Sequence, residues 1–181
     1  METRKRKERA LDAFLVASAR LGDQRSFAML VTRWDSRLRA HAWRLLGNED
    51  QARDVVQQSW VDIIRGLGRL QDDAAFPVWA YRIVSRRCAG MIASARQRRR
   101  LDAALAAEPP ADSNEPQDYA TLRAAVRALP PEQRAAVALY HYEEMSVAET
   151  AVALDVPAGT VKTRLMHARR KLRVLLLGDE T

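Results

Sequence analysis

Basic and polar side chains gather on one face of the last predicted helical segment, from about residue 157 to residue 176. The residues expected on this face are Thr160, Lys162, Thr163, Arg164, His167, Arg170 and Lys171. Arginine can pair with a guanine edge through two hydrogen bonds, and lysine can neutralise a phosphate. Thr160 lies near the start of the segment, where a hydroxyl and the free backbone amides can donate to phosphate. The pattern indicates a helix that binds the major groove of DNA.

The segment before this one supplies a partner helix. Ser146 and Glu149 have the spacing of a capping box, which predicts a short helix that ends near Asp155. Apolar residues spaced to pack two crossed helices are Val147, Ala151, Leu154, Val156, Val161, Leu165 and Leu172. Two helices joined by a tight turn, the second long and basic, are typical of a helix-turn-helix. A solvated basic face is the alternative, but the capping box and partner helix favour DNA binding.

A second basic stretch lies in the first half of the chain, where no acid interrupts residues 82–100. Its basic residues are Arg82, Arg86, Arg87, Arg96, Arg98, Arg99 and Arg100. Trp79 and Tyr81 lie beside them, and aromatic rings next to arginine suit unstacked single-stranded bases. Trp79 is nevertheless on the apolar side of its segment, where a core position is the more common role. This stretch is therefore less diagnostic than the helix-turn-helix.

The sequence shows no recognisable set of residues for covalent catalysis. No Ser/His/Asp arrangement or phosphate loop is found, and His41, His141 and His167 are too scattered for a zinc site. We therefore predict no catalytic residues, no metal, no cofactor and no enzyme activity. Cys88 is the only cysteine. Neighbouring arginines would lower the pKa of an exposed thiol there, but a buried structural cysteine is favoured.

The chain has 181 residues and a formal net charge of +7, which suggests a polyanionic partner. Its charged N-terminal residues lead into no continuous apolar stretch, so they do not form a signal peptide. No apolar run is long enough to span a membrane. We expect a cytoplasmic protein without membrane insertion.

Helical periodicity over most of the chain predicts an all-α fold. Residues 1–100 and 119–181 are expected to form two small helical domains, the second containing the helix-turn-helix. Residues 101–118 contain three prolines, and every charged residue from 102 to 118 is acidic, so we expect a flexible linker. Within the first domain, Leu11, Phe14 and Leu15 share one face of the first helix.

Four segments resemble the extracytoplasmic-function (ECF) sigma factors of bacterial RNA polymerase, over nearly the whole length of the chain. These are residues 52–58 (ARDVVQQ), 76–84 (FPVWAYRIV), 129–134 (LPPEQR) and 159–165 (GTVKTRL), the last followed by Ala168-Arg169. The last match is highly specific, and the segments occur in the order and at the spacing of the family.

The resemblance implies three binding surfaces. The β′ subunit of core polymerase would contact Asp54, Gln57, Gln58 and Trp60. The promoter −10 element would contact Trp79, Arg82, Arg86 and Arg87. The −35 element would contact the outer face of the recognition helix, residues 160–171. The acidic linker would run through the polymerase cleft. Implied partners are core RNA polymerase, with its β′ and β subunits, promoter DNA and an anti-sigma factor.

Three positions depart from the family in the −10 segment. Arg86 stands where the family usually has asparagine, Gly90 replaces an aspartate, and Ala93 replaces an arginine. Arginine cannot reproduce the paired donor and acceptor of asparagine, so we expect an unusual or less strict −10 preference. Gly90 also weakens the helix by about 1 kcal/mol relative to alanine.

These observations favour an ECF-type sigma factor that binds core polymerase and directs promoter recognition, DNA melting and transcription initiation. The alternative is a classical helix-turn-helix regulator that acts without sigma activity and binds a palindromic operator without polymerase. An enzyme acting on nucleic acid lacks a catalytic constellation. A helical adaptor for acidic proteins would show no salt-sensitive affinity for DNA.

Overall fold

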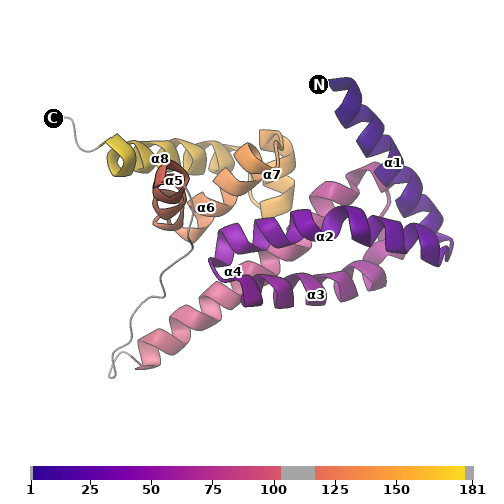
Figure 1. The fold of residues 1–181 in the computed structure, drawn as a ribbon, viewed down its shortest axis with the longest axis horizontal. Coiled ribbons are helices and arrows are strands. Elements are labelled where there is room, and N and C mark those ends of the chain that lie inside the picture. The colour runs from indigo at the N-terminus through magenta and orange to yellow at the C-terminus, as the bar shows by residue number, and fades with distance from the viewer. Residues whose placement is uncertain (1, 103–116, 178–181) are drawn as a thin grey trace.

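The structure is a computed structural model that describes residues 2–102 and 117–177. The regular structure of these residues is entirely helical, as the sequence predicts (Figure 1). The first unit contains α1 (Glu2–Arg20), α2 (Gln24–Leu46), α3 (Glu49–Gly66), the short 3-10 helices η1 (Leu67–Arg69) and η2 (Asp73–Ala75), and α4 (Phe76–Asp102). The second unit contains α5 (Gln117–Arg127), α6 (Pro131–Val137), the π-helical segment η3 (Ala138–Tyr142), α7 (Val147–Leu154) and α8 (Ala158–Leu177).

The turn between α2 and α3 is fixed by the residues that the sequence suggests. Gly47 ends α2 in the left-handed conformation, with φ of 73°, and its amide donates to the carbonyl of Trp43. Asn48 caps α3 by accepting a 2.9 Å hydrogen bond from the amide of Gln51. Acidic residues in the first turn of α3 face the positive end of the helix dipole. The two helices therefore pack side by side in the first unit.

Apolar side chains from α2, α3 and α4 form most of the core of the first unit. Large side chains of these helices that are fully buried include Leu30, Leu38, Val55, Val56, Ile63, Phe76 and Val84. Trp34 is at the centre of an aromatic cluster, with ring centroids 5.6 Å from Phe76 and 5.8 Å from Tyr81 in edge-on geometry. Such contacts add to the stabilisation from area burial alone.

Helix α1 packs against α2 through a face that includes a charged residue. Leu11 is 40% exposed and Phe14 is 64% exposed, whereas Leu15 is buried, so the face that these three residues share is not buried as a whole. Asp12 is buried instead, and its Oδ1 accepts a 2.9 Å hydrogen bond from Nε of Arg33. A paired carboxylate can occupy the inner face of an amphipathic helix, and hydrophobic periodicity does not reveal this.

The second unit contains the predicted helix-turn-helix. Ser146 and Glu149 form both hydrogen bonds of the capping box at the start of α7. Asp155 ends α7 with φ of 56°, a left-handed conformation that aspartate tolerates better than most residues. A local core holds α6, α7 and α8 together, and it contains Leu129, Ala136, Val137, Ala151, Val161, Leu165 and Ala168.

The two units pack against each other, which the expectation of a flexible linker did not suggest. Ala138, Leu139, Met145 and Ala153 of the second unit are buried in the same apolar cluster as the core of the first. Helix α7 packs on α4, while α6 and η3 contact α2 (Figure 1). The middle of the predicted linker, residues 103–116, lies outside the described residues. Helix α4 extends to Asp102 and α5 begins at Gln117, so helix reaches into both ends of the predicted linker.

None of the described helices combines the length and the apolar character that crossing a membrane requires.

Candidate nucleic-acid interface

Helix α8 presents its basic face to solvent. The exposed residues of the predicted set are Lys162, Thr163, His167, Arg170 and Lys171, whereas Thr160 and Arg164 are half-buried. Val161, Leu165 and Ala168 point inward and are at most 4% exposed. The helix therefore separates a packed face from a basic face, as a recognition helix must.

Local hydrogen bonds fix the start of α8. The amides of Thr160 and Val161 both donate to the carbonyl of Pro157, which sets the first turn. The hydroxyl of Thr163 donates to the carbonyl of Gly159 at 3.1 Å, so its proton is used within the helix. Thr163 can therefore offer its oxygen to a base donor or its methyl group to an apolar contact.

Arg82 of α4, one of the predicted −10 residues, is paired across the two units. Its Nη2 lies 2.9 Å from Oδ1 of Asp155, at the turn of the helix-turn-helix. Arg86, one turn further along α4, is exposed and forms no ion pair with any described residue. The structure thus leaves Arg86 available to an anion, while a carboxylate of the second unit occupies Arg82.

Arg87 is held by two side chains of α3. Its guanidinium contacts Asp62 Oδ2, at 2.7 Å from Nε, and Gln58 Oε1, at 2.9 Å from Nη1. Gln58 belongs to the surface predicted to bind polymerase, whereas Arg87 belongs to the surface predicted to bind DNA. These two surfaces are therefore joined through one side-chain cluster.

Trp79 lies half-buried between α4 and the end of α3. Its ring centroid is 6.3 Å from that of Phe76. A Cβ atom at Gly66 would lie only 2.8 Å from Cζ2 of Trp79, so the close approach of this ring requires glycine. The packing of Trp79 agrees with its interpretation as largely a core residue.

The outer face of α3 combines polar and apolar side chains. Asp54, Gln57 and Gln58 are exposed, as a polymerase-binding surface requires. Trp60 is turned toward α2 instead, where its Nε1 donates to Asp35 Oδ1 at 3.1 Å and its ring packs against Phe27. Trp60 supports the surface from beneath rather than forming its exposed part.

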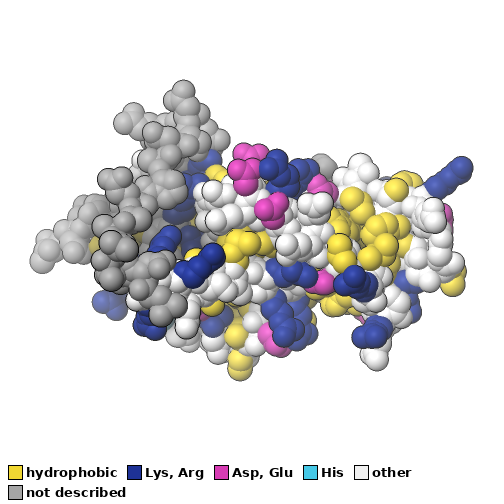
Figure 2. All heavy atoms as spheres, turned by 90° about the horizontal axis from the view of Figure 1, so that it is seen from below, with side chains coloured by type: hydrophobic (Ala, Val, Ile, Leu, Met, Phe, Trp, Pro, Cys, Tyr) yellow, Lys and Arg dark blue, Asp and Glu magenta, His cyan; other side chains and the backbone are white. Residues whose placement is uncertain are grey.

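Two apolar residues of α3 were missed by the sequence reasoning. Val61 is 43% exposed and Ile64 is 56% exposed. Figure 2 shows a group of hydrophobic side chains open to solvent, with lysine and arginine around it, in the view from below. The signal was available, because residues 57, 61 and 64 follow helical spacing from Asp54.

The interface between the two units contains a half-buried carboxylate, Glu143. Glu143 accepts hydrogen bonds from the hydroxyl of Tyr81 and, at 2.7 Å, from Nη1 of Arg44. Arg44 also lies over the ring of Tyr142, 4.5 Å from its centroid. Burial raises the pKa of Glu143, while its donors act in the opposite direction. The pair is therefore largely desolvated, which makes loss of one partner costly.

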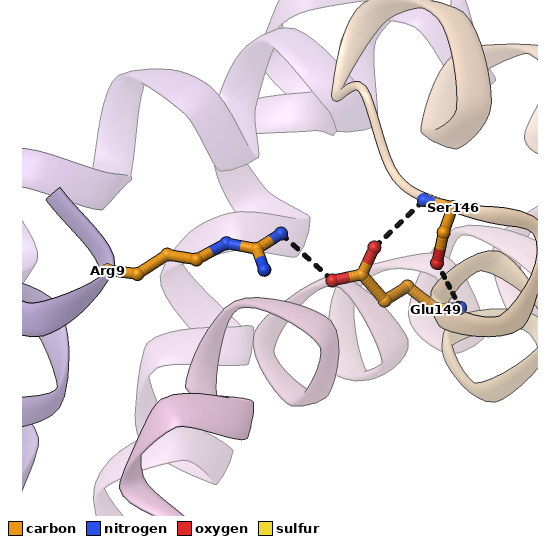
Figure 3. Close-up of polar contacts among 3 residues, drawn as sticks. All are labelled: Arg9, Ser146 and Glu149. Atoms are coloured by element: carbon orange, nitrogen blue, oxygen red, sulfur yellow. Dashed lines mark hydrogen bonds and ion pairs between the residues drawn. The ribbon is translucent and has the colours of Figure 1, made fainter. Parts of the chain in front are cut away.

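A second ion pair between the units involves the capping box. Arg9 of α1 reaches Oε1 of Glu149 at 2.9 Å, while Oε2 of the same carboxylate accepts from the amide of Ser146 (Figure 3). The capping residue of α7 is thus shared with α1. Interactions with Arg9 and Ser146 lower the pKa of Glu149, against the effect of burial.

Two buried side chains, His41 and Cys88, are of types that can serve as catalytic or redox groups. His41 is fully buried and its Nε2 lies 2.9 Å from Ser85 Oγ; burial lowers the pKa of His41 to about 3. Cys88 is buried as predicted, and burial raises the pKa of its thiol to about 12. Both groups are therefore neutral at pH 7 and serve packing. No group of three or more His, Cys, Asp or Glu side chains among the described residues is placed to hold a metal ion.

Comparisons with known proteins match both units. Residues 30–100 match the family model described as Sigma-70 region 2, and residues 119–172 match Sigma-70, region 4. The ECF RNA polymerase sigma factor SigM of Mycobacterium tuberculosis strain H37Rv is 34% identical, covering 91% of this chain and 84% of the relative. The RNA polymerase sigma-H factor of Pseudomonas aeruginosa is 28% identical, covering 89% of this chain and 91% of the relative.

Solved structures show the same fold. A structure of CnrH in complex with the cytosolic domain of CnrY has a TM-score of 0.72 at 26% identity and covers 94% of this chain and 99% of that chain. The sigma factor RpoE in complex with the anti-sigma factor NepR, from Bartonella quintana, has a TM-score of 0.70 at 23% identity and covers 85% of this chain and 98% of that chain.

Proposed function

The chain belongs to the extracytoplasmic-function family of RNA polymerase sigma factors, and on this premise we propose how its residues divide between polymerase and promoter DNA. The units bounded at residues 100 and 119 have separate tasks. The first binds core polymerase and the opened −10 element, and the second binds the −35 duplex.

The second unit is proposed to bind the −35 duplex through the basic face of α8. Arg164, Lys162 and His167 meet the −35 major groove. Lys162 and His167 are exposed on α8, and Arg164 is half-buried beside the packed face of the helix. Arg170 and Lys171 neutralise phosphates, and Thr160 donates to a phosphate at the helix start. This division predicts that Arg164 determines base preference, whereas Lys171 mainly sets affinity and its dependence on salt.

The basic side of α4 is proposed to bind the opened −10 element. Arg86 is available without rearrangement, and Arg82 becomes available once Asp155 moves away. Arg87 is held by Asp62 and Gln58, so it would join the DNA contact only if its guanidinium shares or leaves these partners. Trp79 supports this surface through its packing against Phe76 and Gly66. Unstacking costs a few kcal/mol per step, which the basic surroundings help to offset.

The outer face of α3 binds the β′ subunit of core polymerase. Asp54, Gln57 and Gln58 supply polar contacts, and the exposed Val61 and Ile64 supply apolar area at the centre of the interface. The β subunit contacts the second unit. Polymerase then holds both units at the promoter spacing, and tethering two weak sites raises their combined affinity.

We infer further that the protein acts by binding alone, as a cytoplasmic partner of polymerase, without a cofactor. An anti-sigma factor is proposed as its regulator, supported by the likeness in fold to a sigma factor solved with an anti-sigma factor. Such a partner would compete with polymerase for the surfaces described above.

Run-off transcription with purified core polymerase on a promoter library tests this function. The full chain should confer defined start sites and reveal both promoter elements together. A chain that binds a palindromic operator tightly without polymerase, and gives no start-site selection with it, would instead be a classical regulator.

A further inference from the structure

A cavity of about 550 Å³ lies where the two units meet, away from the DNA-facing residues assigned above. It is bordered by the end of α2, the second half of α4 and the turn between α5 and α6. All of its charged lining residues are arginines: Arg96, Arg98, Arg99, Arg127 and Arg134. Met91, Ile92 and Leu129 form part of an apolar wall beside them. The cavity therefore combines concentrated positive charge with apolar surface.

The five guanidinium groups are not neutralised within the described residues. No carboxylate there forms an ion pair with any of them, whereas Arg44 and Arg82 each have an acidic partner. Positive charges this close repel one another, at a cost that depends on how far water screens them. An arrangement of this kind is stabilised when an anion enters.

Arg134 shows the need for an anion most directly. Its Nη1 donates to the carbonyl of Arg127 at 3.2 Å, but its buried Nε has no hydrogen-bond partner. Burial lowers the pKa of Arg134, and the charges of Arg127 and Arg96 add to this effect, while the charge of Glu132 acts in the opposite direction. Arg127 is itself positioned by Trp43, with its guanidinium carbon 5.1 Å from the ring centroid. Arg96, Arg127 and Arg134 therefore lie close enough for their positive charges to repel one another.

We propose that this cavity binds a small anion with two or more linked phosphate groups. The planar guanidinium group pairs with phosphate oxygens through two parallel hydrogen bonds, so several arginines match a phosphate chain. The volume is in the range of small-molecule sites, about 300–1,000 Å³. The apolar wall gives a nucleotide base a place to pack, which favours a nucleoside triphosphate over inorganic triphosphate.

Binding at this position links the two units. Arg96 and Arg99 come from α4 of the first unit, whereas Arg127 and Arg134 come from α5 and α6 of the second. A ligand that needs both sets binds the packed arrangement better than a separated one and therefore shifts the population toward it. In this arrangement Arg82 remains paired with Asp155, so the anion opposes promoter binding.

Isothermal titration of the full chain with ATP and with inorganic triphosphate, without magnesium, tests the proposal. Both should bind, ATP more tightly. Arg127→Gln and Arg99→Gln should each weaken binding about tenfold or more, since a hydrogen bond to a charged group is typically worth at least that factor. Arg100→Gln, on the same helix but outside the cavity lining, and Arg173→Gln, on α8, remove the same charge and should change affinity less than threefold.

The titration is repeated with the variant E108Q/D112N/E115Q, which removes three acids of the sequence between the two units and should bind at least as tightly. Circular dichroism checks that each variant is folded, and Arg99, which is exposed, gives a test that does not depend on a buried residue. Absence of binding in both proteins, or equal losses in the cavity and control variants, would overturn the proposal. Binding of inorganic triphosphate equal to that of ATP would place the phosphates in the cavity and remove the role of the apolar wall.

Discussion

Arg82 Nη2 of the first unit and Asp155 Oδ1 of the second lie 2.9 Å apart and form an ion pair. One residue is proposed to bind the −10 element, and the other forms the turn that orients the −35 recognition helix. A paired guanidinium is less available to phosphate, so this arrangement would oppose promoter engagement if Arg82 binds DNA as proposed. The contact links the packing of the two units to the availability of Arg82.

Replacing Asp155 with asparagine should increase the affinity of the free protein for a single-stranded −10 oligonucleotide. Asparagine tolerates the left-handed conformation at this position, so the turn should remain intact. The pair is largely exposed, which limits the effect to about 1 kcal/mol, or roughly fivefold. Fluorescence anisotropy at low salt measures it. Asp50→Asn removes an equal charge elsewhere, and a similar gain in that variant would contradict a specific role for Asp155.

Replacing Arg164 with alanine should weaken recognition of the −35 element by about 1–3 kcal/mol and relax the preference at one base position. Transcription by the reconstituted holoenzyme on −35 variants measures both effects. Arg173→Ala, further along α8, serves as the matched control. If strength and base preference stay unchanged in Arg164→Ala, the side chain does not recognise a base.

Replacing Asp54 with lysine should abolish binding to core polymerase while leaving the fold intact, because Asp54 is exposed on α3. Co-purification with core polymerase gives the binding result, and circular dichroism gives the fold. Asp50→Lys reverses another exposed charge one turn earlier on the same helix and should retain most binding. Normal co-purification of Asp54→Lys would exclude this residue from the interface.

Replacing Arg86 with asparagine should change the −10 base preference, since asparagine offers a donor and an acceptor to a base edge while arginine offers donors only. Arg86 forms no ion pair with a described residue, so the replacement should not disturb the fold. Sequencing of transcripts from a randomised −10 library measures the preference. An unaltered library profile would show that the departure at this position has no consequence for recognition.

The free energy of unfolding should fall as the pH decreases below about 6.5, because of His41. Burial lowers its folded-state pKa to about 3, so between these values the unfolded state binds a proton that the folded state does not. The loss can reach about 1.4 kcal/mol per pH unit. Urea unfolding at pH 7 and pH 5.5 measures it.

The variant His41→Gln stays neutral and can keep a hydrogen bond to Ser85, so it should show a smaller pH dependence than the parent. His167→Gln removes an exposed histidine and should leave the dependence unchanged. Equal slopes in the parent and His41→Gln would mean that His41 does not control this part of the pH profile.

Local features of the sequence were sufficient to predict the helices and the helix-turn-helix. Asn48 and the Ser146–Glu149 capping box act over three or four residues, so their hydrogen bonds follow from spacing alone. The inward face of α8 likewise follows from its apolar period. The apolar period did not predict the buried face of α1, because this face contains Asp12, whose burial depends on its ion pair with Arg33 of α2.

Residue types and their order determined the family, the all-helical fold and the basic face of α8, because these depend on short-range spacing and composition. Only the tertiary structure brought Arg82 to Asp155, Tyr81 to Glu143, and arginines of both units around one cavity. Each of these contacts joins residues more than 25 positions apart, and a linear pattern does not contain the relative placement of two packed units. That placement is decided by the shared apolar core, in which Leu139 and Met145 pack with side chains of α2 and α4.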